Sequence, residues 1–505
     1  MKTYYRNKTC GQLRRDDVGA EVTLAGFVHR VRDLGGLVFL DLRDHYGKTQ
    51  VVMSREQADE LAGLRPESVM QIKGKVKLRE ESNPELSTGE IEVEYLQGSF
   101  LSKTESLPFS VTDERNIPEH DRLRYRFLDI RRDRVHRNLT LRCEVIRKIR
   151  EVMHGKGFLE LETPILTGTS PEGARDFVVP SRLHPGKFYA LPQAPQQFKQ
   201  LLMAGGFDRY FQIAPCFRDE DSRADRSPGE FKQLDMEMAF VSQEDVLETS
   251  EAVMHEVFSA FTEQPVSQPP FLRLSYEEAM ASYGSDKPDL RIKERICDLA
   301  SVFQDTDFKV FQKVLEEGKS IRALKFDLEE LPSRKYFDGL IEYFQSIGGG
   351  GLAWMAWDGE KRKGSIKKFI GDEQWQRLTE ILEIDGPCMI LIAGGEDPSI
   401  LPALGKLRLK LAKEHGKVEE GAYRFCWIVD FPMFEEDPET GEVVFGHNPF
   451  SMPQGGLEAL KSEDPLEIKA WQYDIVCNGV ELSSGAIRNH DPETMYEAFK
   501  IAGYD

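Results

Sequence analysis

Residues 210–241 read YFQIAPCFRDEDSRADRSPGEFKQLDMEMAFV and gather the densest chemistry of the chain. Apolar runs at 210–214 and 236–241 flank a polar segment with proline and glycine, a pattern that predicts an antiparallel hairpin with a long loop. Arginines at strand ends can bind a polyanion, and carboxylates can bind a metal ion or an amine. A solvated charged loop accounts for the same pattern, so alone it marks only a candidate site. Its charged residues are Arg218, Asp219, Glu220, Asp221, Arg223, Asp225 and Arg226.

The length and composition predict a soluble protein of several domains. A chain of 505 residues is long enough for two to four domains, each with its own core. There is no apolar run of membrane-spanning length and no signal-peptide core at the N-terminus, which predicts a cytoplasmic location without a membrane partner. The seven cysteines are scattered without a C-x-x-C pair, so we expect them reduced and bound to no zinc ribbon.

The net charge of -20 is unevenly distributed along the chain. Residues 1–150 carry 28 basic and 24 acidic side chains, a net of +4, whereas the remainder carries 38 and 62, a net of -24. Most of the basic excess lies between Arg122 and Arg150. A basic region on an acidic body is compatible with steering a polyanion to one face, although solvated helices explain these charges equally well.

The first 105 residues predict a small β-barrel. Alternating apolar residues mark strands in EVTLAGFVHRV, LVFLDLRD and TQVVM. A short helix near 55–63 and the strands VMQIKGKVKLR and GEIEVEYLQGSF complete the order of an oligonucleotide-binding (OB) barrel, which commonly binds single-stranded nucleic acid. Phe27 and Phe39 are candidate base-stacking residues, with Arg30, Arg32 and Gln50 nearby in sequence. Both aromatic residues would serve equally as core.

A polar, proline-bearing linker at 106–125 precedes an amphipathic helix around 141–153, which we expect Gly157 to stop. The segment FLELE then predicts a strand that ends at Pro164. TGTSPEGARDF at 167–177 has the composition of a mobile lid and equally of a surface loop. QAPQQFKQLLMAGG predicts a helix with Gln196 and Lys199 on one face.

The region 285–419 changes character and predicts an inserted α/β domain without a reaction centre of its own. The β-rich segments that follow include YRFCWIVDFPMFE, FGHNPF and WQYDIVCNGVELSSGAIRNHD. In the last of these, Asp474, Glu481 and Arg488 recur every seven residues. An uninterrupted strand would place Asp474 and Glu481 on opposite faces, so we expect a bulge at Gly479 to bring both carboxylates to one ligand.

Together these segments resemble the bacterial-type aspartyl-tRNA synthetases, class II enzymes of the same subgroup as the asparaginyl and lysyl enzymes. The likeness covers essentially the whole chain, and its most specific strings are FRDEDSRADR with DMEM, TSPEGARDF, FKQLLM and YDIVCNGVELSSGAIR. It implies an α+β multidomain fold in which a class II antiparallel sheet is flanked by helices. The implied boundaries are 1–105 for an anticodon-binding OB barrel, 106–125 for a hinge, 126–284 and 420–505 for two parts of a catalytic domain, and 285–419 for an inserted GAD-type domain.

The resemblance implies ATP-dependent activation of L-aspartate and its transfer to tRNA-Asp. It places Arg218 on the α-phosphate of ATP and on the aspartate carboxyl group, as a catalytic residue. Asp219 and Glu220 are expected to contact ATP as well. Gln196 and Asp235 are expected to accept from the substrate α-amino group.

Lys199 and Arg488 are implied to clamp the aspartate side chain, because a carboxylate satisfies a bidentate arginine better than an amide does. Glu172 and His447 would close over the amino acid. The second catalytic residue, Glu481, would contact ATP and share Mg2+ with Asp474, since hard oxygen ligands suit this ion. The anticodon would be read by His29, Arg32, Phe39 and Gln50.

No side chain is needed as a covalent nucleophile in this reaction. The substrate carboxylate attacks the α-phosphorus, pyrophosphate leaves, and a terminal ribose hydroxyl of tRNA takes the aspartyl group. Catalysis would consist of positioning and of neutralising phosphate charge. A homodimer through motif 1 at 142–167 is implied, although an amphipathic helix suits a monomer core equally.

The sequence departs from the family at three places. Ser227 and Pro228 stand where a Gln-Pro pair is usual, which questions the usual glutamine contact to ATP, and Asn448 replaces a second histidine. The family also continues past an IAGYD-like segment into a strand and helix, motif 3, with an arginine for the γ-phosphate. We therefore expect this chain to be a truncated form that activates aspartate poorly on its own.

Two other functions stay open at this point. One is an asparaginyl- or lysyl-tRNA synthetase. Lys199 and Arg488 argue against the lysyl enzyme, because a lysine ammonium group would need acidic partners, and the large insertion argues against the asparaginyl enzyme. The other is a tRNA-binding paralogue with impaired catalysis, which would have no use for an amino-acid pocket. The sequence leaves open whether tRNA-Asn is also charged, because that depends on contacts to the third anticodon base near His29 and on the strand after Lys77.

Overall fold

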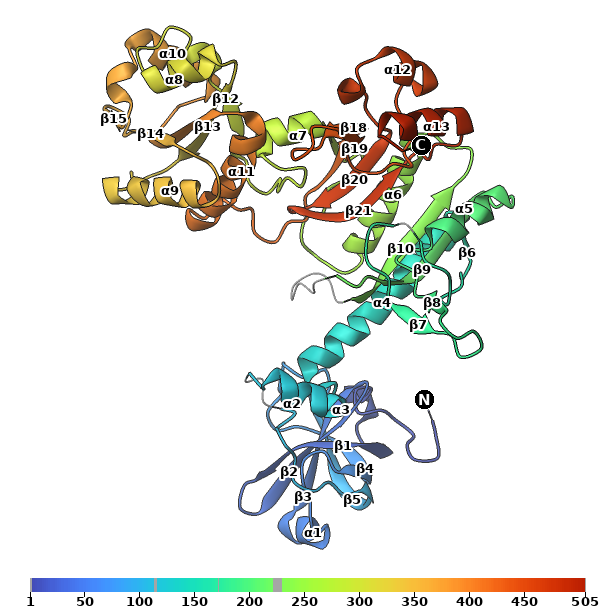
Figure 1. The fold of residues 1–505 in the computed structure, drawn as a ribbon. Helices are drawn as coiled ribbons and strands as arrows, with labels where there is room; N and C mark the ends of the chain where they lie inside the picture. Colours follow the sequence, from blue (N-terminus) through green and yellow to red (C-terminus); the bar gives the residue numbers. More distant parts are fainter. Residues whose placement is uncertain (1, 113–115, 171, 221–228, 505) are drawn as a thin grey trace. The chain divides into compact units, whose positions relative to one another are not determined.

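The computed structural model describes residues 2–112, 116–170, 172–220 and 229–504, and Figure 1 shows their elements. The chain divides into two compact units, Met1–Glu144 and Val145–Asp505. No helix in the described part of the chain is both long and apolar enough to cross a membrane.

The first unit contains a closed five-stranded barrel in the order β1-β2-β3-β5-β4, which confirms the predicted OB fold. Its interior is filled by alternating aliphatic residues such as Leu24, Leu40 and Ile72, which are fully buried. A capping box at Ser54 starts the predicted short helix. The elements are β1 (Glu21–Asp33), β2 (Leu37–Asp44), β3 (Gly47–Ser54), α1 (Arg55–Glu60), β4 (Val69–Leu78) and β5 (Ile91–Ser102).

Short helices follow the barrel, and they start inside the segment predicted as a plain hinge. They are α2 (Glu119–Arg124) and α3 (Arg126–Asp129), and the long helix α4 (Asp133–Gly155) comes next. Gly157 adopts φ +80° just after α4, as expected of a residue that ends a helix. The strand predicted after it is short, since β6 covers only Leu159–Glu160.

The predicted hairpin at 210–241 is confirmed. β9 (Arg209–Phe217) and β10 (Glu230–Met238) pair antiparallel along their whole length, and β6 adds a third, parallel strand beside β9. β10 is thus one edge of a three-stranded sheet in the described part of the chain. The neighbouring elements are β7 (Val178–Pro180), β8 (Phe188–Ala190), α5 (Gln196–Ala204) and α6 (Gln243–Ser259).

A second sheet has the strand order β11-β17-β20-β21. Its central strands are buried, and the carboxylate of Glu251 on α6 supports them by accepting from Trp427 Nε1 at 2.9 Å and from the Phe271 backbone at 3.1 Å. The strands are β11 (Leu272–Ser275), β17 (Phe425–Val429), β20 (Gln472–Cys477) and β21 (Val480–Ala486). Beside them lie α7 (Tyr276–Tyr283), β18 (Phe434–Glu436), β19 (Val443–Phe445), α12 (Gly456–Ser462) and α13 (Pro492–Ile501).

The region predicted as an insertion builds a five-stranded antiparallel sheet in the order β12-β13-β16-β14-β15. Its central strand β16 is buried on both faces because helices cover both, α9 and α11 on one side and α8 and α10 on the other (Figure 1). The strands are β12 (Ile296–Asp298), β13 (Ser320–Asp327), β14 (Leu352–Trp357), β15 (Arg362–Gly364) and β16 (Cys388–Gly395). The helices are α8 (Lys309–Glu316), α9 (Arg334–Ser346), α10 (Asp372–Ile381) and α11 (Asp397–Glu414).

Arg408 on α11 holds the segment that leads into this sheet. Its guanidinium group is 1% exposed and donates to the carbonyl oxygens of Asp289, Ile292 and Glu294 at 3.0, 2.7 and 2.5 Å. Burial lowers the pKa of Arg408 to about 10, so the group stays charged at neutral pH. A buried cation that satisfies three carbonyls fixes the path of the chain between residues 289 and 294.

Replacing this residue tests its structural role. Arg408→Met keeps the side-chain length but removes all three donors, and we expect a loss of stability of about 3 kcal/mol, since buried acceptors left without partners are costly. Urea denaturation followed by tryptophan fluorescence measures the change. Arg377→Met removes an exposed i, i+4 ion pair with Glu373 and should cost about 0.5 kcal/mol or less. Equal losses in the two variants would contradict this role.

Candidate functional site

Lys199 is the buried centre of the amino-acid pocket predicted from the sequence. It lies one turn into α5, whose first residue is Gln196, and it is 7% exposed. Its Nζ atom is 2.8 Å from Asp235 Oδ1 and 3.2 Å from Glu237 Oε2. Burial acts to lower the pKa of Lys199, but the two carboxylates outweigh burial and raise that pKa. The ammonium group is therefore charged at neutral pH.

Glu237 is a site residue that the sequence analysis missed. It lies two positions after Asp235 on β10, and residues two apart in a strand point to the same face. The signal was present in the DMEM string as two carboxylates with strand spacing. Their combined charge stabilises Lys199 more than either carboxylate would alone.

Arg488 follows β21 and reaches the same pocket from the second sheet. Its Nη2 atom donates to Gln196 Oε1 at 3.0 Å, although the two residues are 292 positions apart. A cleft of about 960 Å³ runs between β10 and β21, and Lys199, Asp235, Glu237 and Arg488 all line it. The structure thus brings together four residues that the sequence analysis assigned to aspartate: Gln196, Lys199, Asp235 and Arg488.

Several polar atoms of the predicted site residues are buried without a hydrogen-bond partner in the described part of the chain. They are Glu172 Oε1, Gln196 Nε2, Asp235 Oδ2 and Asp474 Oδ1. Buried polar atoms in folded proteins are normally paired, so each of these needs a partner. Of these four residues Asp235 lines the cleft, so a polar ligand there would supply a partner for Asp235 Oδ2.

Glu172 lies in the segment predicted as a lid. Burial raises the pKa of its carboxyl group. Gln193 holds the next part of this segment, because its Oε1 accepts from the Ala174 backbone at 2.9 Å and its Nε2 donates to Asp176 Oδ1 at 2.6 Å. Residues 174–176 are therefore tied down in this structure.

Arg218, at the start of the charged loop, is half-buried, and its backbone N–H donates to the Gly229 carbonyl at 2.9 Å. Its guanidinium carbon lies 5.2 Å from the ring centre of Phe231, within cation–π range. The backbone N–H of Asp219 donates to the Arg175 carbonyl at 3.0 Å, whereas the side chains of Asp219 and Glu220 are exposed. The rest of the loop, with the departure at Ser227, lies outside the described residues.

Asp474 and Glu481 share one face, but not for the reason predicted. The segment folds into two strands, and Gly479 forms the turn between them with Asn478, at φ +79° and +53°. The expected bulge at Gly479 is therefore wrong, and the register shift lies instead between Ile475 and Val476. Val476 pairs with Glu481 and lies two positions from Asp474, which places both carboxylates on the same face.

A lysine that the sequence analysis did not assign occupies this end of the site. Lys287 Nζ lies 2.6 Å from Asp286 Oδ2 and 3.3 Å from Glu481 Oε2. Asp474 is 6% exposed, and burial raises its pKa to about 7, with Glu481 adding to the effect. No cluster of three or more metal-ligating side chains exists among residues 2–112, 116–170, 172–220 and 229–504.

His447 packs at the same end of the site. Its ring centre is 4.9 Å from that of Phe431 and 5.6 Å from that of Tyr276, both in edge-on contact. Burial lowers the pKa of His447, so the ring is neutral at neutral pH. Lys287 and Glu481 are among the charges that act on it.

Three of the four residues predicted to read an anticodon meet on the barrel surface. Arg32 lies opposite Phe39 in the β1–β2 ladder, with its guanidinium carbon 5.8 Å from the ring centre. Arg32 Nη2 also donates to Gln50 Oε1 at 3.0 Å, and Gln50 Nε2 donates to Glu92 Oε2 at 2.8 Å. Glu92 is a further member of this group that the sequence analysis missed.

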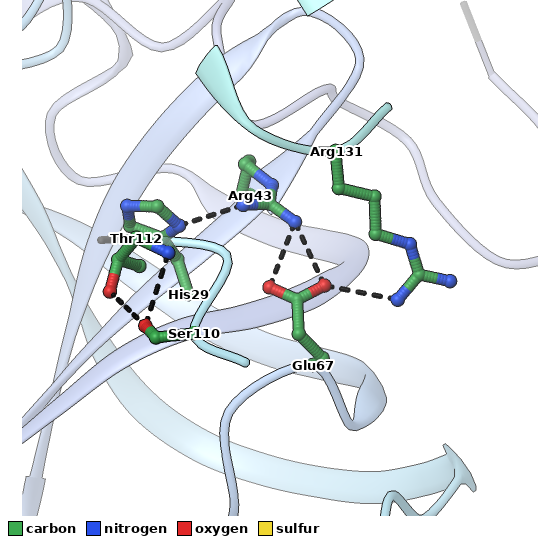
Figure 2. Close-up of polar contacts among 6 residues, drawn as sticks. All are labelled: His29, Arg43, Glu67, Ser110, Thr112 and Arg131. Carbon is green, nitrogen blue, oxygen red and sulfur yellow. Dashed lines mark hydrogen bonds and ion pairs between the residues drawn. The ribbon is translucent and has the colours of Figure 1, made fainter. Parts of the chain in front are cut away.

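His29 makes different contacts from these three. Its Nδ1 atom lies 2.8 Å from Nη1 of Arg43, and Arg43 in turn pairs with Glu67 (Figure 2). Burial lowers the pKa of His29 to about 4, and the cations Lys48 and Arg43 add to the shift. The ring is therefore neutral at physiological pH.

Close relatives of the chain are named as aspartate–tRNA ligases, with or without tRNA-Asn in the name. A protein of Streptomyces griseus named aspartate–tRNA ligase is 55% identical over 506 residues, covering 99% of this chain and 84% of the relative. A protein of Rickettsia bellii named aspartate–tRNA(Asp/Asn) ligase is 52% identical over 512 residues, covering 99% of this chain and 85% of the relative.

Solved structures with low identity share the fold. The aspartyl tRNA synthetase of Entamoeba histolytica has a TM-score of 0.55 at 18% identity and covers 97% of this chain and 80% of its own. An asparaginyl-tRNA synthetase of Pyrococcus horikoshii has a TM-score of 0.56 at 18% identity, and the match covers 99% of this chain and 87% of the synthetase.

Two family models match the chain, and together they span both units. Residues 22–94 match the OB-fold nucleic acid binding domain, in agreement with the closed barrel. Residues 118–505 match the model for tRNA synthetases class II (D, K and N). The α+β architecture and the polar cleft between β10 and β21 fit this assignment. The chain belongs to the class II tRNA synthetases of the aspartate, lysine and asparagine group.

Proposed function

We propose that the chain is an aspartate–tRNA ligase, which joins L-aspartate to ATP as aspartyl-adenylate and transfers the aspartyl group to tRNA-Asp. The names of the close relatives support this proposal. The structural observation that carries it is the meeting of Lys199 and Arg488 in one cleft, next to buried acceptors that lack partners. Among aspartate, lysine and asparagine, the amino acids of this family, aspartate is the one whose side chain needs cations, because its carboxylate is negative.

The pocket has a complementary group for each charge of the substrate. The free Oδ2 of Asp235 would accept from the α-ammonium group. Gln196 Oε1 already accepts from Arg488, so it would accept from that group through its second lone pair. Lys199 and Arg488 would hold the side-chain carboxylate, the arginine through two parallel hydrogen bonds. Glu172 and His447 would close the pocket. Without a ligand, Lys199 is neutralised by the two carboxylates on β10 and Arg488 is bonded to Gln196, so both are held in place before substrate arrives.

The phosphates of ATP would lie toward the charged loop and β21. Arg218 would neutralise the α-phosphate on which the aspartate carboxylate attacks, while Asp219, Glu220 and Glu481 would contact ATP. The pyrophosphate leaves with the electron pair of the broken P–O bond. These residues would act by positioning and by charge neutralisation, without a covalent enzyme intermediate.

Asp474 and Glu481 have the chemistry of a Mg2+ site. Both offer oxygen ligands on one face, and Asp474 has a buried oxygen without a partner. Bound Mg2+ would offset the negative charge of the phosphates. Lys287 now neutralises Glu481, so its ammonium group must give up that contact when Glu481 binds a cation.

The barrel is the proposed contact with the tRNA anticodon, through His29, Arg32, Phe39 and Gln50. Whether tRNA-Asn is a second substrate is open, because the two relatives described above differ in this part of their names. We propose a cytoplasmic homodimer that uses residues 142–167. Leu159, Ile165 and Leu166 in this range are 53%, 46% and 56% exposed, and exposed apolar residues that cluster favour an interface.

Binding and aminoacylation together test the function. In calorimetric titrations we expect the protein to bind L-aspartate in preference to L-asparagine and L-lysine, and in aminoacylation assays to charge tRNA-Asp at the low rate expected above for this chain. A preference for asparagine would indicate an asparaginyl enzyme. Tight binding of tRNA-Asp without any binding of aspartate would indicate a tRNA-binding paralogue.

A substitution in the cation pair tests how aspartate is selected. Arg488→Gln removes the charge that distinguishes a carboxylate from an amide, and we expect aspartate affinity to fall by about tenfold or more while asparagine affinity changes little. The measurement is calorimetry with both amino acids. Lys232→Gln, an exposed lysine on the same strand as Asp235, should leave both affinities at the wild-type level. Equal losses for both ligands in Arg488→Gln would rule out this basis of selection.

The raised pKa of Asp474 predicts a pH dependence of stability. Its folded-state pKa is about 7 and its unfolded value is about 4, so the folded protein holds a proton that the unfolded chain releases. The wild type therefore loses stability through this group as pH rises from about 4 to about 7, and the loss then levels off. Asp474→Asn cannot ionise, so its Tm relative to wild type should rise across that range.

Thermal unfolding in a chelating buffer between pH 5 and pH 8 measures this effect. The exposed Asp338→Asn variant is the control, and its Tm difference from wild type should not change with pH. Addition of Mg2+ should raise the wild-type Tm more at pH 8 than at pH 5, because only the ionised carboxylate binds the cation. A constant Tm difference for Asp474→Asn would contradict the assignment.

A further inference from the structure

His29 occupies an irregular position in the barrel. Val28 pairs with Leu42 and Arg30 with Asp41, so His29 is the extra residue of a β-bulge in β1. A bulge changes the direction of the side chain that it carries. The backbone beside the bulge is held by two hydrogen bonds, from Glu67 N–H to the Val28 carbonyl at 2.7 Å and from Val28 N–H to the Ser68 carbonyl at 2.8 Å.

The contact with Arg43 determines which ring nitrogen of His29 carries the proton. A guanidinium group has only donors, so Arg43 Nη1 donates to Nδ1 at 2.8 Å and Nδ1 must accept. The proton of the neutral ring is then on Nε2. The low pKa of His29 agrees with this neutral form. Nε2 has no hydrogen-bond partner among the residues that the structure describes, which leaves a free donor.

Glu67 determines the position of Arg43. Both of its carboxylate oxygens accept from Arg43 Nη2 at 2.9 Å, and Oε2 also accepts from Arg131 Nη1 at 3.0 Å (Figure 2). The Glu67 side chain is 1% exposed and that of Arg43 is 9% exposed. The backbone of Glu67 also adopts φ +66°, an unfavourable value for glutamate. A buried carboxylate that binds two guanidinium groups leaves Arg43 little freedom to move.

A small cavity lies beside this network. Its volume is about 200 Å³, and its wall includes His29, Arg30, Glu67, Leu107 and Ser110. Cavities for drug-sized ligands run from about 300 Å³ upward, so this one suits a single planar heterocycle. Its wall includes an imidazole and a guanidinium group, from His29 and Arg30, on which an unstacked base can stack, and the hydroxyl group of Ser110, which can hydrogen-bond to a base edge.

We propose that Glu67 and Arg43 are positioning residues for tRNA recognition: they hold the His29 imidazole as the Nε2–H tautomer, so that it donates to an acceptor atom of one unpaired tRNA nucleobase. This inference rests on the proposed function and extends it to residues that act through His29. The donor favours bases with an acceptor at the contacted edge and disfavours those with a donor there. Loss of the Glu67 carboxylate would free Arg43, and the ring would exchange between its two tautomers.

Glu67→Gln tests this role because it keeps the side-chain shape and removes the charge that binds both guanidinium groups. Long-range 1H–15N spectra of histidine-labelled protein report the protonated ring nitrogen of His29, with assignment by His29→Gln. We expect Nε2–H alone in the wild type and a mixture of tautomers in Glu67→Gln. The affinity for tRNA-Asp, measured by filter binding, should fall about fivefold to a hundredfold, the range for one lost base contact. Aspartate binding should stay at the wild-type level.

Matched variants separate positioning from folding. Arg131→Gln removes the other partner of Glu67 without touching His29, and Glu21→Gln removes a charge from the exposed pair with Lys73, so both should keep the Nε2–H tautomer. If Glu67→Gln does not fold, Arg43→Lys takes its place, since lysine has a single nitrogen atom where Arg43 uses two, Nη1 for His29 and Nη2 for Glu67. An unchanged tautomer in Glu67→Gln or Arg43→Lys, or a changed tautomer with full tRNA affinity, overturns the inference. Failure of the wild type to bind aspartate and tRNA-Asp would instead overturn the proposed function.

Discussion

A buried charge has to be paired within the protein, and this constraint determines the geometry of the candidate sites. Transfer of an ammonium or carboxylate group out of water costs several kcal/mol even after the protein relaxes. Lys199 meets this requirement with two carboxylates on one strand, and Glu67 meets it with two guanidinium groups. In both cases the buried ion has two partners of opposite charge. A group held from two directions cannot rotate away, so the pairing that makes burial possible also sets the direction of the functional atoms.

The same pairing explains how the proposed amino-acid pocket can be charged and still present free groups to a ligand. Asp235 uses one oxygen for Lys199 and keeps the other without a partner. Gln196 likewise uses its oxygen for Arg488 and keeps its Nε2 atom free. Each residue is thus half satisfied by the protein and half available to a ligand. The free halves are the source of binding energy, and the satisfied halves keep the groups in position before the ligand arrives.

Local patterns predict the elements, whereas the pocket residues follow from the resemblance to a family. Alternating apolar residues predict the barrel and the hairpin, but the charges of FRDEDSRADR alone fit a solvated loop equally well, and only the likeness of this string to the family motif points to the pocket. Periodicity failed where the chain turns inside a segment that looks continuous. Asp474 and Glu481 were assigned to one strand, although Asn478 and Gly479 make a turn between them. Asn478-Gly479 is itself a typical two-residue turn sequence, and the recurrence of charges every seven residues does not indicate a continuous strand.

Residues that come from outside the motifs could not have been predicted from the sequence. Lys287 stands in a segment with no motif of its own, and only the tertiary fold brings it to Glu481. Arg408 stabilises the chain just beyond Lys287 by donating to three of its carbonyl groups. No local pattern in either segment encodes that contact, because its donors and acceptors are more than 100 positions apart. A single sequence does not show a contact between two distant residues when neither stands in a motif. Here such a contact determines that Lys287 is the cation that neutralises Glu481 before a ligand binds.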